Sequence, residues 1–135
     1  MFGISESPLV TGNMVIASPG GKKASMVAFN INDGKVIWET EPVDNAPQYI
    51  NPKLIEYAGK KMIINVMGTY ILAVDAQNGK VLWKENYAAQ HGGVVLLGNN
   101  LFASNHMAKY WAHPVIKNGK LYLRHGDVLM VYQIK

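Results

Sequence analysis

The sequence ILAVDAQNGKVLW, residues 71–83, decides the fold of this chain, because a second stretch repeats it. Residues 26–38 read MVAFNINDGKVIW and align with the first stretch without a gap. Identical residues stand 45 positions apart in the pairs Ala28 and Ala73, Gly34 and Gly79, Lys35 and Lys80, and Trp38 and Trp83. A fixed period of this length indicates one supersecondary unit that is stacked along the chain.

The same order of short strands and glycine turns surrounds both stretches. Each unit begins with a strand led by a proline, at 7–10 or 51–55, and a second short apolar strand follows a glycine turn. The last two strands form a hairpin that is predicted to turn at Asp33-Gly34 or Asn78-Gly79, dipeptides that suit positive φ. No stretch of ten residues has the period of a helix. The sequence therefore predicts an all-β chain of four-stranded antiparallel units.

The C-terminal part of the chain repeats three of the four strands. It has turns at Asn118-Gly119 and Gly126-Asp127, but the Gly-Lys-x-x-Trp strand does not follow. The stretch at 91–104 reads as the first two strands of one more unit. We therefore expect a single repeat domain over residues 1–135, with units at about 6–42, 49–87, 91–106 (partial) and 111–135.

Composition and charge exclude several classes of protein. The hydrophobic share of 49% is that of a globular chain, and the charged share of 16% is too low for a disordered chain or a coiled coil. The net charge is +4, but Arg124 is the only arginine and most lysines stand at predicted turns. Recognition of nucleic acid needs arginine forks or a clustered basic stripe. We expect solvated loop lysines and no nucleic-acid partner.

The sequence carries no sign of disulfides or of a membrane anchor. It has no cysteine, which removes disulfides and cysteine-ligated metals. The first residues lack the basic and apolar regions of a signal peptide, and no apolar run approaches the length of a membrane span. We expect no membrane span, and a leader that is missing from this chain if the parent protein is exported.

The pattern Ala-x-Asp-x-x-x-Gly-Lys-x-x-Trp, complete from Ala73 to Trp83, resembles the repeat of pyrroloquinoline-quinone-type (PQQ-type) β-propellers. In the first unit Asn30 stands in the Asp position. Residues 111–135 look like the closing segment of bacterial PQQ-like repeat proteins. The resemblance covers nearly the whole chain and implies that each unit is one blade of an incomplete propeller of about three blades. Relatives with this ending carry more blades, so 91–110 resembles the remnant of an internal deletion or the product of a shortened gene.

The resemblance implies two possible functions. Quinoprotein alcohol and glucose dehydrogenases of this superfamily hold PQQ and calcium in the funnel of a complete ring, whereas others, such as the outer-membrane assembly lipoprotein, are not catalytic. This chain has no cysteine pair, too few blades for a ring and no recognisable calcium-ligand cluster. We expect a non-catalytic scaffold or binding module, without cofactor, of a periplasmic or extracellular bacterial protein. The alternative is a fragment of a quinone-dependent alcohol or sugar dehydrogenase.

The repeated polar and aromatic residues have structural interpretations. Trp38 and Trp83 recur once per unit, as packing between blades requires, whereas a stacking platform for a quinone occurs once per ring. Asn30 and Asp75 precede a glycine turn, where a short polar side chain more often caps the turn than binds a ligand. We therefore interpret six residues as structural positions of the repeat: Trp38, Trp83, Asn30, Asp75, Gly34 and Gly79.

The densest polar cluster is Arg124-His125-Gly126-Asp127, which is predicted to lie at one end of a blade. His113 begins a strand of the same unit, so Arg124, His125, Asp127 and His113 are the best candidates for ligand binding. The four histidines of the chain lack the spacing of a metal site, and we expect no metal. No catalytic motif names a nucleophile or a base. Open apolar faces and free strand edges further predict that the chain associates with itself, or else collapses into a compact sandwich that is not a propeller.

Overall fold

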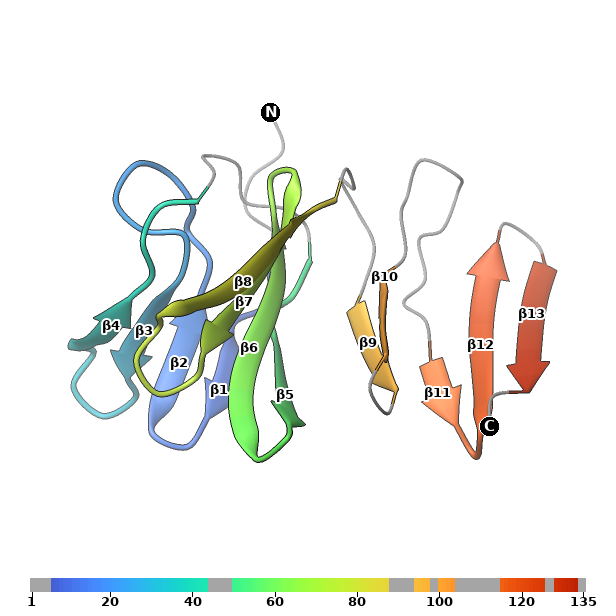
Figure 1. Ribbon diagram of the computed structural model, residues 1–135. Coiled ribbons are helices and arrows are strands. Elements are labelled where there is room, and N and C mark those ends of the chain that lie inside the picture. The colour runs from blue at the N-terminus through green and yellow to red at the C-terminus, as the bar shows by residue number, and fades with distance from the viewer. Residues whose placement is uncertain are drawn as a thin grey trace. The chain divides into compact units, whose positions relative to one another are not determined.

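The computed structural model describes residues 6–43, 50–87, 94–97, 100–103, 115–125 and 128–133. Every regular element in these ranges is a β-strand, which confirms the all-β prediction (Figure 1). No described helix is long and apolar enough to cross a membrane. The chain divides into two compact units, residues 1–88 and 89–135, which we treat separately. That the repeats form a single domain over 1–135 stays a prediction.

Two four-stranded antiparallel sheets make up the described part of the first unit. The first sheet has the order β1-β2-β3-β4 and the second has the order β5-β6-β7-β8, so each strand pairs with its neighbour in the chain. The strands of the first sheet are β1 (Leu9–Thr11), β2 (Met14–Ala17), β3 (Val27–Asn30) and β4 (Val36–Glu39). Those of the second are β5 (Lys53–Tyr57), β6 (Lys60–Met67), β7 (Tyr70–Asp75) and β8 (Val81–Asn86).

The second unit contains a hairpin and a third sheet. The hairpin pairs β9 (Val94–Leu97) with β10 (Asn100–Ala103). The third sheet has the order β11-β12-β13, from β11 (Val115–Lys117), β12 (Lys120–His125) and β13 (Val128–Gln133). Sheets of four, four and three strands are those of an incomplete set of propeller blades, as the sequence predicted.

The first two sheets repeat each other in register as well as in order. In each sheet the ladder between the last two strands shifts by one residue, between Ala28 and Phe29 or between Ala73 and Val74. This irregularity lies beside the tryptophan strand both times, so the two tryptophans take the same place in their sheets. Residues directly opposite one another across a sheet share one face.

Two rows of residues therefore define the two faces of each sheet. We call the row that contains the tryptophan, or its equivalent, the Trp row, and the row on the other face the opposite row. The Trp rows are Leu9, Ile16, Ala28 and Trp38 in the first sheet, Lys53, Ile64, Ala73 and Trp83 in the second, and Val115, Tyr122 and Val131 in the third. The opposite rows are Val10, Val15, Phe29 and Val36 in the first sheet, and Leu54, Ile63, Val74 and Val81 in the second.

The core of the first unit lies between the Trp row of the first sheet and the opposite row of the second. All eight residues of these rows belong to one packed apolar cluster. Trp38 is 6% exposed, and Ile16 and Ile63 are fully buried. Burial of an aliphatic side chain contributes about 1.5–3 kcal/mol. The two sheets are thus held together mainly by contact between unlike faces.

The hairpin turns differ in one respect from the prediction. The hairpins are predicted to turn at Asp33-Gly34 and Asn78-Gly79, dipeptides that suit positive φ, but only the glycines have positive φ, at 69° and 71°. The loop is longer because the Gly34 N–H donates to the Asn30 carbonyl and the Gly79 N–H to the Asp75 carbonyl, both at 2.9 Å. The side chains of Asn30 and Asp75 cap the loop, which removes the need for a two-residue turn.

Candidate functional site

The predicted ligand-binding cluster is only partly described. Arg124 and His125 stand at the end of β12, opposite Leu129 and Val128 of β13. The Arg124 side chain is exposed. His113 and Asp127 lie outside the described residues. A ligand site at these four residues stays a prediction.

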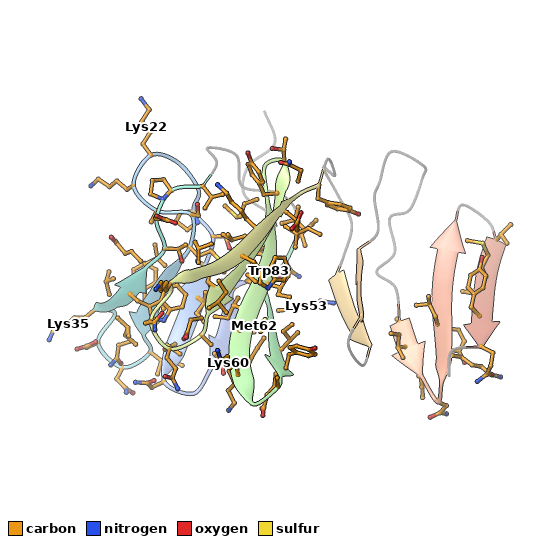
Figure 2. All side chains as sticks on the ribbon, viewed as in Figure 1. Lys22, Lys35, Lys53, Lys60, Met62 and Trp83 are labelled. Carbon is orange, nitrogen blue, oxygen red and sulfur yellow. The ribbon has the colours of Figure 1, made fainter. Side chains whose placement is uncertain are left out.

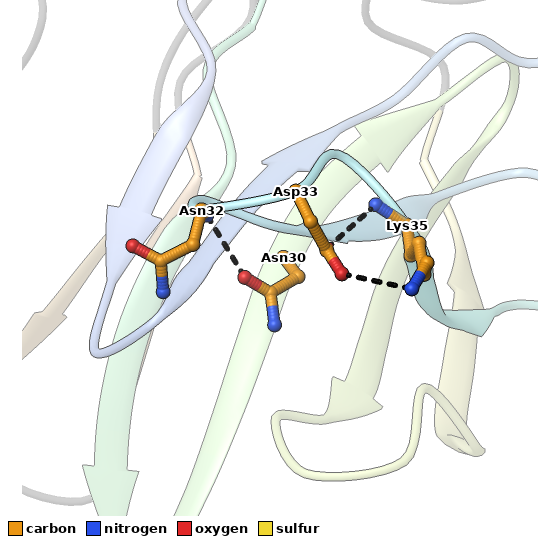
Figure 3. A network of polar contacts seen from close by, with 4 residues as sticks. All are labelled: Asn30, Asn32, Asp33 and Lys35. Carbon is orange, nitrogen blue, oxygen red and sulfur yellow. Dashed lines mark hydrogen bonds and ion pairs between the residues drawn. The ribbon is translucent and has the colours of Figure 1, made fainter.

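The capped turns account for Asn30 and Asp75. Oδ1 of Asn30 accepts the Asn32 N–H at 2.9 Å, and Oδ1 of Asp75 accepts the Gln77 N–H at 2.8 Å. Figure 3 shows the first of these turns, where Asp33 also accepts the Lys35 N–H at 3.1 Å and pairs with the Lys35 ammonium at 3.3 Å. One oxygen of each side chain is therefore engaged with the backbone two residues on.

Trp38 and the nearby Thr40 join the first sheet to the second through three contacts. Its indole Nε1–H donates to the Ala76 carbonyl at 3.3 Å. Its ring lies against Gly79, where an added Cβ would overlap Trp38 Cε3 and lie 2.8 Å from Cδ2. Beside it, the buried Thr40 hydroxyl donates to the Gly79 carbonyl at 3.0 Å. The Trp38 ring is therefore enclosed by the neighbouring sheet.

The Trp row of the second sheet differs from that of the first by a charge. Lys53 stands where Leu9 stands, and Figure 2 labels it together with Met62 and Trp83. Burial lowers the pKa of Lys53. Trp83 is partly exposed, whereas Ile64 and Ala73 of the same row are buried. The repeat therefore conserves the tryptophan and its register without conserving the apolar residue of the first strand.

A buried polar cluster between the first two sheets was missed by the sequence analysis. Glu6 accepts the Ser18 N–H at 2.8 Å and the Asn65 side-chain amide at 3.2 Å. The same amide donates to the Ser18 hydroxyl oxygen at 2.7 Å, and the Ser18 hydroxyl also bonds the carboxylate. Burial raises the pKa of Glu6, and these hydrogen bonds partly offset that effect. The one signal in the sequence is Asn65 itself, a polar residue inside the apolar run of β6.

This polar cluster is a structural contact and has no room for a substrate. Ser18 is 1% exposed and Asn65 is fully buried, so neither reaches solvent. Within the described ranges, no group of three His, Cys, Asp or Glu side chains comes together as a metal site. Among the described residues, the exposed faces of the sheets are the candidate functional surface.

Two of the rows defined above are open to solvent. In the first sheet Val10 and Val36 of the opposite row are 59% and 51% exposed. In the third sheet Val115 and Val131 of the Trp row are 53% and 48% exposed. Both rows are entirely uncharged. Contiguous exposed apolar residues of this kind mark interaction surfaces.

Repeated four-stranded antiparallel sheets that pack face to face define a β-propeller-type repeat protein. The family comparison is more specific. The chain belongs to the family described as outer membrane protein assembly factor BamB, whose PQQ-like repeat model matches residues 3–132. The resemblance that the repeat motif suggested is thereby confirmed.

The comparisons with curated proteins and with solved structures are less informative than the family match. No curated protein matches the chain significantly. Among solved structures, the crystal structure of the computationally designed Ika4 protein matches with 15% identity and a TM-score of 0.43. That match covers 95% of this chain and 64% of the designed protein, so the chain spans less than two thirds of its length.

Proposed function

We propose that this chain is a non-catalytic β-propeller module that acts as a scaffold or as a binding domain. The observation that supports it is the pair of exposed apolar rows, one on the first sheet and one on the third. They are uncharged strand surfaces of the kind that bind other protein chains, whereas small-molecule sites are concave with a few convergent polar groups. The family, named for an outer membrane assembly factor, supports a periplasmic role in a bacterial envelope.

The alternative function is that of a fragment of a quinone-dependent alcohol or sugar dehydrogenase. The polar residues buried between the first two sheets argue against it, because their hydrogen-bonding groups are occupied within the protein. That the chain holds neither PQQ nor calcium is part of the proposal.

Titration with PQQ and calcium tests this proposal. We expect no change in the quinone absorbance, no rise in the melting temperature and no dye-linked oxidation of alcohols or glucose above a heat-denatured sample. A quinoprotein dehydrogenase reconstituted in parallel shows that the assay works. Saturable quinone binding together with dye reduction by the native chain would reverse the assignment in favour of the dehydrogenase fragment.

A further inference from the structure

The two exposed rows are the same two kinds of row that already pack together inside the first unit. There, the Trp row of the first sheet contacts the opposite row of the second. Position by position, Val10 and Val36, which are exposed, and Val15 and Phe29, which are partly exposed, are the counterparts of Leu54, Ile63, Val74 and Val81 in the apolar cluster. The first sheet thus carries, uncovered, the surface that the second sheet uses to cover Trp38.

The third sheet carries the complementary surface. Val115, Tyr122 and Val131 pair across it as Leu9, Ile16 and Ala28 pair across the first sheet. Val115 and Val131 are about half exposed, and Tyr122 is partly exposed. One chain therefore presents a free Trp row on one sheet and a free opposite row on another.

We propose that two copies of this chain associate head to tail, with the Trp row of the third sheet of each copy packed on the opposite row of the first sheet of the other. This inference rests on the proposed function and names its partner as a second copy. A second copy is the occupant that matches both rows at once, because it repeats a contact that the chain already makes internally. A different protein would need one surface that fits the Trp row of the third sheet and another that fits the opposite row of the first sheet.

Two copies are the smallest assembly that covers both exposed rows, because the third sheet of each copy packs on the first sheet of the other. Such head-to-tail contacts close on themselves when the rotation between the copies allows it.

The junction between copies is expected to be weaker than the internal one. The third sheet ends at β13 in the described residues and offers no counterpart of Trp38. Gly34, the counterpart of Gly79, has nothing within 4 Å of an added Cβ. Apolar burial therefore has to hold the copies together without the indole contact, so we expect dissociation on dilution.

Light scattering on a size-exclusion column tests the association at micromolar concentration. We expect the 135-residue chain to elute with the mass of two chains and to shift toward one chain on dilution. Two double variants block one row each: Val10→Lys with Val36→Lys in the first sheet, and Val115→Lys with Val131→Lys in the third. Each alone should be a monomer. Mixed in equal amounts they should form a pair, because each retains the row that the other lacks.

A matched control substitutes two exposed apolar residues outside both open rows, Tyr57→Lys with Leu82→Lys, and should remain a dimer. A monomeric wild-type chain with a folded circular-dichroism spectrum would overturn the proposal. So would dimers of either blocked variant by itself, because they would show a like-to-like interface. Neither result bears on the quinone titration, so the proposed function can fail or stand independently.

A thiol probe tests the same contact with a single substitution in the chain. The protein has no cysteine, so Val131→Cys introduces the only thiol. We expect this thiol to react with maleimide in dilute protein and to lose its reactivity at concentrations where the dimer forms. Val128→Cys on the same strand, also exposed but on the other face, should react at both concentrations. Equal reactivity of Val131→Cys at the two concentrations contradicts the proposed contact.

Discussion

At the scale of single residues, Gly79 is constrained in two ways, by its backbone conformation and by the packing around it. Its φ of 71° favours glycine, and Trp38 occupies the space where a side chain would begin. Gly34 has a φ of 69° but open space around it. The two glycines are therefore alike in backbone and different in packing, which makes them a natural pair for mutation.

We predict that Gly79→Ala lowers the free energy of unfolding more than Gly34→Ala does. Both variants carry a backbone cost of roughly 1–2 kcal/mol for alanine in a left-handed conformation. Gly79→Ala adds overlap with the Trp38 ring, which should cost about 1–3 kcal/mol more. Urea unfolding followed by tryptophan fluorescence measures the difference. Equal losses would mean that the contact with Trp38 contributes nothing to stability.

Glu6 predicts a pH dependence of stability. Burial raises the pKa of Glu6 in the folded chain above 4.5, the value for the unfolded chain. At pH values between the unfolded and the folded pKa, the folded chain binds the Glu6 proton more tightly than the unfolded chain does. The contribution of Glu6 to the free energy of unfolding is therefore largest below pH 4.5 and falls as pH rises through the folded pKa. Glu6→Gln should remove this slope, because the amide does not titrate.

Urea unfolding at a series of pH values from 4.5 upward checks this effect. Glu41→Gln, at an exposed position, is the control and should keep the wild-type slope. If Glu6→Gln also keeps that slope, another group produces it.

Positions that recur every 45 residues could be predicted from the sequence, whereas positions that do not recur could not. Trp38 and Gly79 were found because the period of 45 residues repeats them. Asn65 has no such partner, since Ala17 stands at its place in the first sheet. Glu6 lies before the first strand, where no repeat constrains it. Contacts made once between two sheets leave no periodic signal, and the sequence analysis did not find them.

At the scale of elements, two hairpins differ in the first residue of their turn. The β5–β6 hairpin turns at Ala58-Gly59 and the β11–β12 hairpin at Asn118-Gly119, with both residues of each turn at positive φ. Asparagine adopts this conformation at a lower energetic cost than alanine does. The β5–β6 hairpin therefore forms despite its turn, because its strands are held by the core.

We predict that Ala58→Asn stabilises the chain, by up to about 1–2 kcal/mol if all the backbone cost is relieved. The reciprocal change, Asn118→Ala, should destabilise the chain. Thermal unfolding followed by circular dichroism would show the two melting temperatures moving in opposite directions. A drop with Ala58→Asn would show that the alanine makes a contact that the turn geometry does not reveal.

At the scale of the whole molecule, the sequence predicted the class of fold, an all-β chain with four-stranded antiparallel sheets. The bounds of the repeat units stay a prediction. Local patterns suffice for this because each sheet is built from neighbouring strands. The pairing of a Trp row with an opposite row could not be predicted, since it depends on register across separate sheets.

The contact between Trp38 and Gly79 joins two consecutive units, and each residue has a counterpart one period away, in Trp83 and Gly34. A gene that loses or gains a whole number of 45-residue units brings a tryptophan of one unit against a glycine of another and so creates the same junction again. A deletion that changes the register between the tryptophan strand and the next glycine turn would not recreate this contact. Evolution of chain length in this family is therefore expected to proceed in whole repeats, with copy number changing more easily than any single junction.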